Sequence, residues 1–298
     1  MGLGNHEAHE EHEKKQGQKL ISQIKKMDGF TKVKVSRWSL QLNRRFPISF
    51  AGACVPEGDT FNGVRGPFER IAASKFARVY KGAINFKDRK YNVYIKQYLC
   101  RSPVDFLKHL VRLSRAERSF NAAMMLAEHG LSSPEVIVMG CLRFGPVTFK
   151  NFLITSDLEN AKPVYILLTE SLNNTDKRAF LAALGTTIGK MHAANIFHGD
   201  LRPGNVLAER KDDKWQFHFL DNERTRKFQS LPDRRRLKNL TQINMLANTI
   251  LAKTDRMRFY KSYIKQNPNL TPRRKTIALA TAANTRKRMT GKIPQEQI

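Results

Sequence analysis

The sequence has few cysteines, and it lacks any long hydrophobic run. Its three cysteines (Cys54, Cys100 and Cys141) lie far apart and form no CxxC pair. We therefore expect reduced thiols, and neither a disulfide framework nor a zinc site. No apolar run approaches the roughly 18 residues that a membrane-spanning helix needs. The first residues lack the apolar core of a signal peptide, so we expect a cytoplasmic chain.

Acidic residues are scarce relative to basic ones. The sequence has 53 Lys and Arg residues against 26 Asp and Glu residues, which gives a formal net charge of +27. Such a charge does not select a fold, but it attracts nucleic acid, an anionic membrane surface or a phosphorylated substrate. A solvated basic surface without a specific partner is the alternative. The hydrophobic content of 41% favours a folded core over disorder.

Hydrophobic periodicity divides the chain into a strand-rich first half and a mostly helical second half. Strands are expected within 31–50, 68–81, 90–99, 136–142 and 149–155, and helices within 106–111, 116–127 and 176–194. Two apolar runs within 206–220 flank turn-forming residues and predict a β-hairpin, and the C-terminal residues after it are helical and basic. This order predicts an α+β fold with two lobes.

The most informative motif is the loop that follows the helix of 176–194. Residues 198–205 read HGDLRPGN, so Asp200 and Asn205 are five residues apart, as in the catalytic loop of kinases. An aspartate orients a substrate hydroxyl and accepts its proton, whereas an asparagine offers a neutral oxygen to a hard Mg²⁺ ion. Because Pro203 and Gly204 also favour a turn, two ordinary turn residues are the alternative.

A carboxylate follows the predicted hairpin. Asp221 lies at the end of an apolar strand in residues 219–223, which read FLDNE. An aspartate at this place would reach metal ions that bridge nucleotide phosphates. An ordinary acidic residue at a strand end is the alternative.

The first half supplies a candidate pair of opposite charges. Lys96 lies in the strand-like run VYIKQY, as the lysine of the kinase motif VAIK does, and Glu117 follows on a helix. A lysine held by such a glutamate would grip the nucleotide phosphates. Two alternatives remain open: Lys96 is an ordinary strand residue, and Glu117 belongs to a capping box that begins at Ser114.

These segments together resemble the protein-kinase-like superfamily, and within it the bacterial lipopolysaccharide core kinases that phosphorylate Kdo or heptose. The residues that carry the resemblance are 198–201 (HGDL), 219–226 (FLDNERTR), 234–237 (RRRL) and 128–134 (EHGLSSP). The resemblance covers roughly residues 68–260. It implies an α+β fold with two kinase-like lobes.

The resemblance also implies where the lobes begin and end. Residues 65–158 would form a small N-lobe with an antiparallel sheet and one main helix. Residues 159–298 would form a mostly helical C-lobe that ends in a basic segment, and residues 1–64 an N-terminal extension.

By this resemblance the site binds ATP and Mg²⁺ and transfers a phosphoryl group to an alcohol. The implied roles are as follows: Asp200 is the catalytic base, Arg202 touches the γ-phosphate, Asn205 and Asp221 hold Mg²⁺, Lys96 and Glu117 position ATP, and Ser156, Asp157 and Leu158 form the hinge that meets adenine.

Three features depart from ordinary kinases. The expected glycine-rich loop is replaced by residues 72–78 (AASKFAR), which contain no glycine. Asn239 stands where many relatives carry an aspartate that braces the catalytic loop. No APE segment follows Asp221, which argues against an ordinary protein kinase.

The acceptor implied by the resemblance is a sugar hydroxyl (Kdo or heptose) of an anionic glycolipid, the lipopolysaccharide core. The basic C-terminal residues would then hold the enzyme peripherally at the cytoplasmic face of the inner membrane, although a solvated basic tail is equally compatible with them. Small-molecule kinases of the aminoglycoside or choline type share the loop motif, but their cationic acceptors fit the charge poorly. A pseudokinase scaffold or a nucleic-acid binder is the alternative from another class, and few aromatic residues separate the C-terminal basic residues to provide base stacking.

Overall fold

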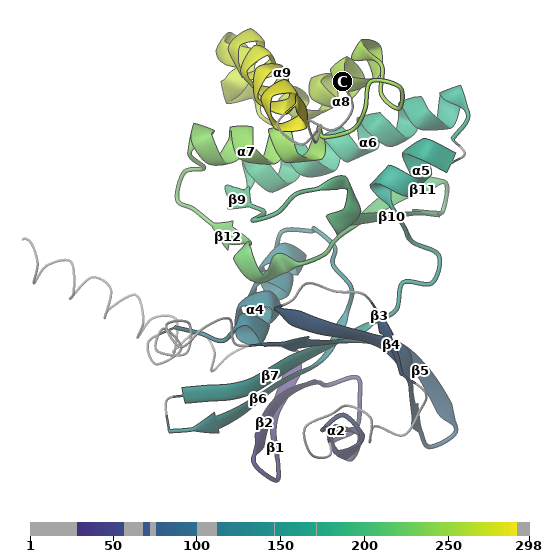
Figure 1. Cartoon of the computed structure of the whole chain (residues 1–298), viewed down its shortest axis with the longest axis vertical. Coiled ribbons are helices and arrows are strands. Elements are labelled where there is room, and N and C mark those ends of the chain that lie inside the picture. The colour runs from purple at the N-terminus through teal and green to yellow at the C-terminus, as the bar shows by residue number, and fades with distance from the viewer. Residues whose placement is uncertain are drawn as a thin grey trace, which may run out of the picture.

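The chain folds into two lobes, one built around a sheet and one built around helices (Figure 1). The computed structural model describes residues 29–56, 68–71, 76–99, 112–145, 147–170 and 172–290. The helix expected in 106–111 lies outside the described residues, as does Cys100. The other two cysteines, Cys54 and Cys141, are free and buried.

The N-lobe contains a seven-stranded antiparallel sheet in the order β1-β2-β6-β7-β5-β4-β3. Its strands are β1 (Phe30–Val35), β2 (Trp38–Asn43), β3 (Glu69–Ile71), β4 (Ala77–Phe86), β5 (Arg89–Tyr98), β6 (Val136–Phe144) and β7 (Val147–Ser156). In β5, which lies within the predicted strand of 90–99, side chains alternate: Val93 and Ile95 are fully buried while Asn92 is exposed.

The first two strands belong to this sheet. β2 pairs with β6, with Leu40 opposite Gly140, and β1 pairs with β2 at the sheet edge. Residues 30–43 are therefore part of the N-lobe and not of an extension that precedes it. Sequence reasoning placed strands here but assigned them to the extension, because their partner strand lies about a hundred residues further along the chain.

The two faces of the sheet are covered differently. Helix α4 (Arg115–Glu128) packs against one face through Ala116, Phe120 and Ala123, and the short helix α2 (Phe50–Ala53) buries Phe50 against the other. A capping box begins α4: the Ser114 hydroxyl accepts from the backbone N–H of Glu117, and the Glu117 carboxylate accepts from the backbone N–H of Ser114. In Figure 1, α4 lies between the sheet and the C-lobe.

The C-lobe is organised around the long helix α6 (Asn174–Ala193), whose residues Phe180, Leu184, Ile188 and Met191 are buried as its periodicity predicts. The other helices are α5 (Val164–Glu170), α7 (Asp233–Ile243), α8 (Lys253–Lys265) and α9 (Arg274–Thr290), with short 3-10 turns η2 (Pro203–Asn205), η3 (Asn222–Arg224) and η4 (Pro268–Arg273). None of the helices in the described residues is long and apolar enough to cross a membrane.

Two small sheets of the C-lobe hold the loops that carry the motifs. β10 (Val206–Lys211) and β11 (Lys214–Phe219) form the predicted hairpin, and β8 (Lys162–Pro163) pairs with β10. β9 (Ile196–Phe197) pairs with β12 (Arg226–Lys227). The segments 198–205 and 220–225 run between these strands, so both motif loops lie beside each other where the lobes meet.

Candidate active site

The loop of residues 198–205 is held from inside by its own histidine. The His198 ring is fully buried; its Nε2 donates to the carbonyl of Leu220 (3.0 Å) and its Nδ1 accepts from the backbone N–H of Asp200 (3.2 Å). Burial lowers the pKa of His198, so the ring is neutral and each nitrogen has one fixed role. The ring thereby ties the loop that carries Asp200 to the strand end that carries Asp221.

Helix α7 braces the same loop. The Asn239 side chain accepts from the backbone N–H of His198 (3.1 Å) and donates to the His198 carbonyl (2.5 Å). A neutral asparagine thus satisfies the loop backbone at the position where the resemblance implies an aspartate. One turn further along α7, Gln242 accepts from the backbone N–H of Leu201 (3.3 Å) and donates to Oδ1 of Asp200 (2.9 Å).

The Asp200 carboxylate is oriented by two hydrogen bonds and an ion pair. Besides Gln242, the amide of Asn205 donates to Oδ2 (3.2 Å), and the guanidinium of Arg202 forms an ion pair with Oδ1 (2.8 Å). One lone pair of Oδ2 therefore stays open on a side chain that is 27% exposed. The carboxylate is thus fixed in direction but remains accessible.

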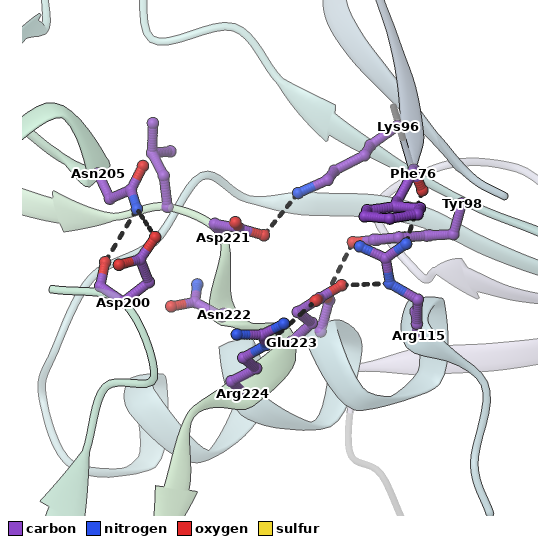
Figure 2. A network of polar contacts seen from close by, with 12 residues as sticks. Phe76, Lys96, Tyr98, Arg115, Asp200, Asn205, Asp221, Asn222, Glu223 and Arg224 are labelled. Atoms are coloured by element: carbon purple, nitrogen blue, oxygen red, sulfur yellow. Dashed lines mark hydrogen bonds and ion pairs between the residues drawn. The ribbon is translucent and has the colours of Figure 1, made fainter. Parts of the chain in front are cut away.

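Asn205 presents an oxygen in a fixed direction. Its amide nitrogen donates to both the backbone carbonyl (2.9 Å) and the carboxylate of Asp200, so its Oδ1 points away from that residue (Figure 2). Its own backbone carbonyl accepts from the N–H of Leu220 (2.9 Å), which places Asn205 next to Asp221.

Asp221 and Lys96 meet across the two lobes. Lys96 Nζ of β5 donates to Asp221 Oδ1 at 2.6 Å, as Figure 2 shows. Burial alone would lower the pKa of Lys96, but the nearby Tyr98 and Asp221 outweigh it, so this pKa is raised. Burial alone would raise the pKa of Asp221, but the nearby Lys96 outweighs it, so this pKa is lowered. Both side chains are therefore charged. Asp221 has φ 56° and ψ 49°, a left-handed conformation that is unusual for a non-glycine residue and common at functional sites.

The structure does not bring Glu117 to Lys96. One Glu117 oxygen accepts from the backbone of Ser114 and the other from Arg143 of β6 (2.5 Å). The predicted pair of Lys96 and Glu117 was wrong for this conformation, because the capping box holds Glu117 at the start of its helix and Arg143 supplies its counter-charge.

A different pair joins α4 to the Asp221 segment. Arg115 donates to Glu223 at 2.6 Å, and both side chains are almost completely buried. The Arg115 guanidinium also donates to the carbonyl of Phe76 and lies over the ring of Tyr98, 4.9 Å from its centroid.

On the C-lobe side Gly199 packs against Arg224, so closely that a Cβ at Gly199 would lie 2.1 Å from the Cβ of Arg224.

The predicted hinge connects the two lobes. β7 ends at Ser156, whose N–H donates to the Glu135 carbonyl, and the N–H of Asp157 donates to the Asn92 carbonyl (2.9 Å each). No described residue accepts from the N–H of Leu158, so this donor is open to a ligand. Lys81 of β4 pairs with the Asp157 carboxylate at 3.1 Å, so this carboxylate forms an ion pair with the N-lobe sheet.

The comparisons with known proteins agree with this site. A family model described as "Lipopolysaccharide kinase (Kdo/WaaP) family" matches residues 68–263. The chain belongs to this family. The predicted resemblance is thereby confirmed, and so is the assignment to a family of kinases.

Two relatives are kinases of lipopolysaccharide sugars by name. The 3-deoxy-D-manno-octulosonic acid kinase of Vibrio parahaemolyticus is 26% identical over 106 residues, which cover 36% of this chain and 43% of that protein. The lipopolysaccharide core heptose(I) kinase WaaP of Escherichia coli is 27% identical over 188 residues, which cover 59% of this chain and 69% of that protein. The matched stretch spans less than half of the Vibrio protein.

A solved structure shares the fold. The structure titled "WaaP in complex with acyl carrier protein" superposes with a TM-score of 0.56 over 74% of this chain and 89% of that chain, at 17% identity. This confirms the predicted kinase-like α+β fold of this lipopolysaccharide kinase family member.

The donors of the site fit a magnesium ion. Mg²⁺ prefers oxygen ligands and is commonly held by one or two carboxylates together with water and phosphate oxygens. Asn205 Oδ1 and the second oxygen of Asp221 are oxygens of this kind on neighbouring backbone segments. Within the described residues, no group of three or more His, Cys, Asp or Glu side chains is arranged to hold a metal ion by itself.

Several residues of the site were not predicted from the sequence. Arg115 lies within the predicted capping box that begins at Ser114, and Glu223 lies in the quoted run 219–226, but only the fold shows that they pair. Gln242 carried a weak signal, because it follows Asn239 by three residues and shares its helix face. Most of the segment 72–78, which replaces the glycine-rich loop, lies outside the described residues.

Proposed function

We propose that this chain is a kinase that transfers the γ-phosphoryl group of ATP to a sugar hydroxyl, Kdo or heptose, of the lipopolysaccharide inner core. The observation that carries the proposal is the convergence of Asp200, Asn205, Asp221 and Lys96 at one place between the lobes. Family membership supports a sugar as the acceptor.

Each residue has a distinct part in the proposed reaction. The open lone pair of Asp200 Oδ2 accepts the proton of the acceptor hydroxyl as its oxygen attacks the γ-phosphorus. The bond from this phosphorus to the bridging oxygen breaks, and ADP leaves with that electron pair. Lys96 binds the nucleotide phosphates, and Arg202, already beside Asp200, stabilises the charge of the transferred group.

Asn205 and Asp221 would hold Mg²⁺, which would neutralise the negative charge of the nucleotide phosphates. Lys96 now neutralises Asp221, so nucleotide binding would exchange this ion pair for contacts with phosphate and metal. Adenine would meet the hinge of Ser156, Asp157 and Leu158, where the free N–H of Leu158 is a donor for a ring nitrogen. Glu117 would take part only if α4 rearranged, because Arg143 and the helix cap occupy it.

The proposed setting is the cytoplasmic face of the inner membrane. An anionic glycolipid acceptor lies at that surface, and the net charge of +27 favours peripheral attachment to anionic lipid. The charge equally favours an anionic acceptor over the cationic acceptors of aminoglycoside or choline kinases. The boundary between the two lobes would lie between residues 158 and 159, since β7, the last strand of the N-lobe sheet, ends at Ser156.

The test is phosphoryl transfer from ATP to lipopolysaccharide isolated from cells that lack the gene. We expect Asp200→Ala to lower the rate by about 10²–10⁴-fold, the range for loss of a general base. Asp88→Ala, an exposed aspartate in the β4–β5 turn, is the matched control and should keep full activity. Thermal unfolding checks that both variants fold, and mass spectrometry locates the added phosphate. Wild-type activity in the Asp200→Ala variant would refute the mechanism.

A further inference from the structure

A groove lined by basic residues lies between α7 and α9. Its volume is about 630 Å³, and its lining comprises Arg234, Arg235, Leu237, Lys238, Thr241, Asn284, Lys287 and Arg288. Five of these residues are basic and none is acidic. We call it the basic groove.

The cations of the basic groove lack ion-pair partners among the described residues. Within the described ranges, none of its five basic side chains forms an ion pair. The nearby Arg236 does pair with Asp233 (3.9 Å) and also hydrogen-bonds to Tyr263, so it belongs to the core of the lobe. Uncompensated guanidinium and ammonium groups around a concave surface form a binding site for anions.

The cations also crowd one another. Burial lowers the pKa of Lys238, and the positive charges of Arg235, Arg224 and Arg288 lower it further, while the charge of Asp200 raises it. Arg226 of β12 is affected in the same way, first by burial and then by Arg112 and Arg235. The positive surface therefore continues from the groove across β12, and a bound anion would relieve this repulsion.

The basic groove lies next to the catalytic loop. The Arg235 guanidinium and Lys238 Nζ lie 5.1 Å and 5.5 Å from the ring centroid of Phe197. Phe197 ends β9 and directly precedes the loop that carries Asp200. The same helix α7 supplies Asn239 and Gln242 to that loop. In Figure 1, α7 lies on the side of β9 away from the N-lobe sheet, whereas Lys96 approaches Asp221 from the sheet.

We propose that the basic groove binds an oxyanion of the acceptor saccharide, a carboxylate or a phosphate group, and thereby presents the accepting hydroxyl to Asp200. The inference rests on the proposed function and names the feature of the acceptor that this chain recognises. Arginine donors match both oxyanions with paired hydrogen bonds, and Lys238 adds a point charge beside Phe197, which precedes the catalytic loop.

The first experiment measures steady-state kinetics with the full chain and lipopolysaccharide from cells that lack the gene. We expect Lys238→Gln and Arg288→Gln each to raise the KM for the acceptor at least tenfold while the KM for ATP stays within twofold. Lys261→Gln removes an exposed cation of α8 outside the groove and is the matched control. An unchanged acceptor KM in both groove variants would overturn the inference.

The second experiment does not require turnover. With Mg-ADP in excess, so that the nucleotide site is filled, calorimetric titration with inorganic phosphate and separately with glucuronate tests the groove itself. We expect one of these probes to bind the wild type and the Lys261→Gln variant, and its affinity to fall at least tenfold in Lys238→Gln/Arg288→Gln. Equal binding by all three proteins would contradict the proposed site.

The two experiments separate the possible failures. If the wild type phosphorylates no saccharide but still binds an oxyanion through the basic groove, the proposed function fails and the groove remains an anion site. If the groove variants lose affinity for anionic vesicles but keep their acceptor KM, the groove contacts lipid headgroups, and the inference about the acceptor is wrong.

Discussion

At the residue scale, Asp200 depends on a chain of buried polar side chains with compatible donors and acceptors. Arg236 donates to the Tyr263 hydroxyl (2.6 Å), and this hydroxyl donates to His192 Nδ1 (3.0 Å). His192 Nε2 donates to Asn239 (3.2 Å), and the Asn239 amide donates to Gln242 (3.3 Å). Gln242 then donates to Asp200. Because each member from Arg236 to Gln242 donates to the next, the network fixes one orientation of the Gln242 amide and of the carboxylate that it contacts.

Gln242, the residue of this network that donates to Asp200, should affect turnover. Gln242→Met keeps the length of the side chain but removes the donor to Asp200 Oδ1. A hydrogen bond to a charged group contributes about 1.5–3 kcal/mol, so we expect kcat to fall at least tenfold while the KM for ATP is unchanged. Gln216→Met on the exposed face of β11 is the matched control. A variant that melts earlier but keeps the wild-type kcat would show that Gln242 is only structural.

The first histidine of the network should make stability depend on pH. Burial, and then the charge of Arg236, lowers the pKa of His192 to about 3, against about 6.5 in an unfolded chain. Between these values the unfolded state binds more protons, so the free energy of unfolding falls as the pH falls below 6.5. At one pKa unit per 1.36 kcal/mol, the loss from pH 7 to pH 5 is about 2 kcal/mol.

Urea unfolding at the two pH values measures this effect. His192→Gln keeps a donor and an acceptor but does not titrate, so its loss of stability between pH 7 and pH 5 should be smaller than that of the wild type by about 2 kcal/mol. Above pH 7 the difference between the two proteins should stay constant. Parallel curves down to pH 5 would show that His192 does not contribute.

Single residues of the site were predictable where a motif fixes them locally. Asp200 and Asn205 share one loop, and Asp221 follows a hairpin of nearest neighbours, so their types and spacing point to their chemistry. Glu117 was wrongly paired with Lys96, because its actual partner Arg143 lies in strand β6, which comes close to Glu117 only in the folded sheet. The partners of Asp200 on α7 depend on packing between distant segments, which periodicity does not reveal.

At the element scale, α4 is the helix of the N-lobe that contacts the Asp221 segment. It makes this contact through the buried pair of Arg115 and Glu223. The strands of this lobe were predictable from their strand-like apolar runs, but the place of β1 and β2 at the sheet edge was not, because pairing with β6 leaves no local signal.

Removing one partner of this buried pair should be strongly destabilising. Arg115→Met removes the nearest counter-charge of the buried Glu223, and Glu223→Gln removes that of the buried Arg115, so we expect each variant to lose about 3–5 kcal/mol. The double variant should lose less than the sum of the single variants, because the two residues are in direct contact. Denaturant unfolding of the four proteins gives this coupling energy.

An exposed pair of similar length serves as the control for that cycle. Arg210 and Asp176 are 3.1 Å apart, with 48% and 31% of their side chains exposed. Exposed pairs are worth about 0–1 kcal/mol, so the coupling energy there should be small. Equal coupling in both cycles would mean that the Arg115–Glu223 pair does not hold α4 to the Asp221 segment.

At the scale of the whole molecule, the positive charge is distributed over both lobes, but α9 concentrates part of it near the C-terminal end of the described chain. Lys275 and Arg286 are exposed on this helix, lie outside the lining of the basic groove and form no ion pair with described residues. If the chain attaches to an anionic membrane, these residues are suited to contact it without taking part in acceptor binding.

Vesicle binding tests this attachment. Each Lys or Arg near an anionic surface contributes about 1 kcal/mol, so Lys275→Gln/Arg286→Gln should weaken binding to phosphatidylserine vesicles by about 2 kcal/mol, or roughly 30-fold. Lys32→Gln/Lys34→Gln removes the same net charge from β1 and should have a smaller effect if α9 faces the membrane. Binding of the wild type should weaken steeply as salt shortens the Debye length from about 10 Å at 0.1 M to 3 Å at 1 M. Equal losses in both double variants would show that attachment follows net charge alone, and no binding at low salt would exclude peripheral attachment to anionic lipid.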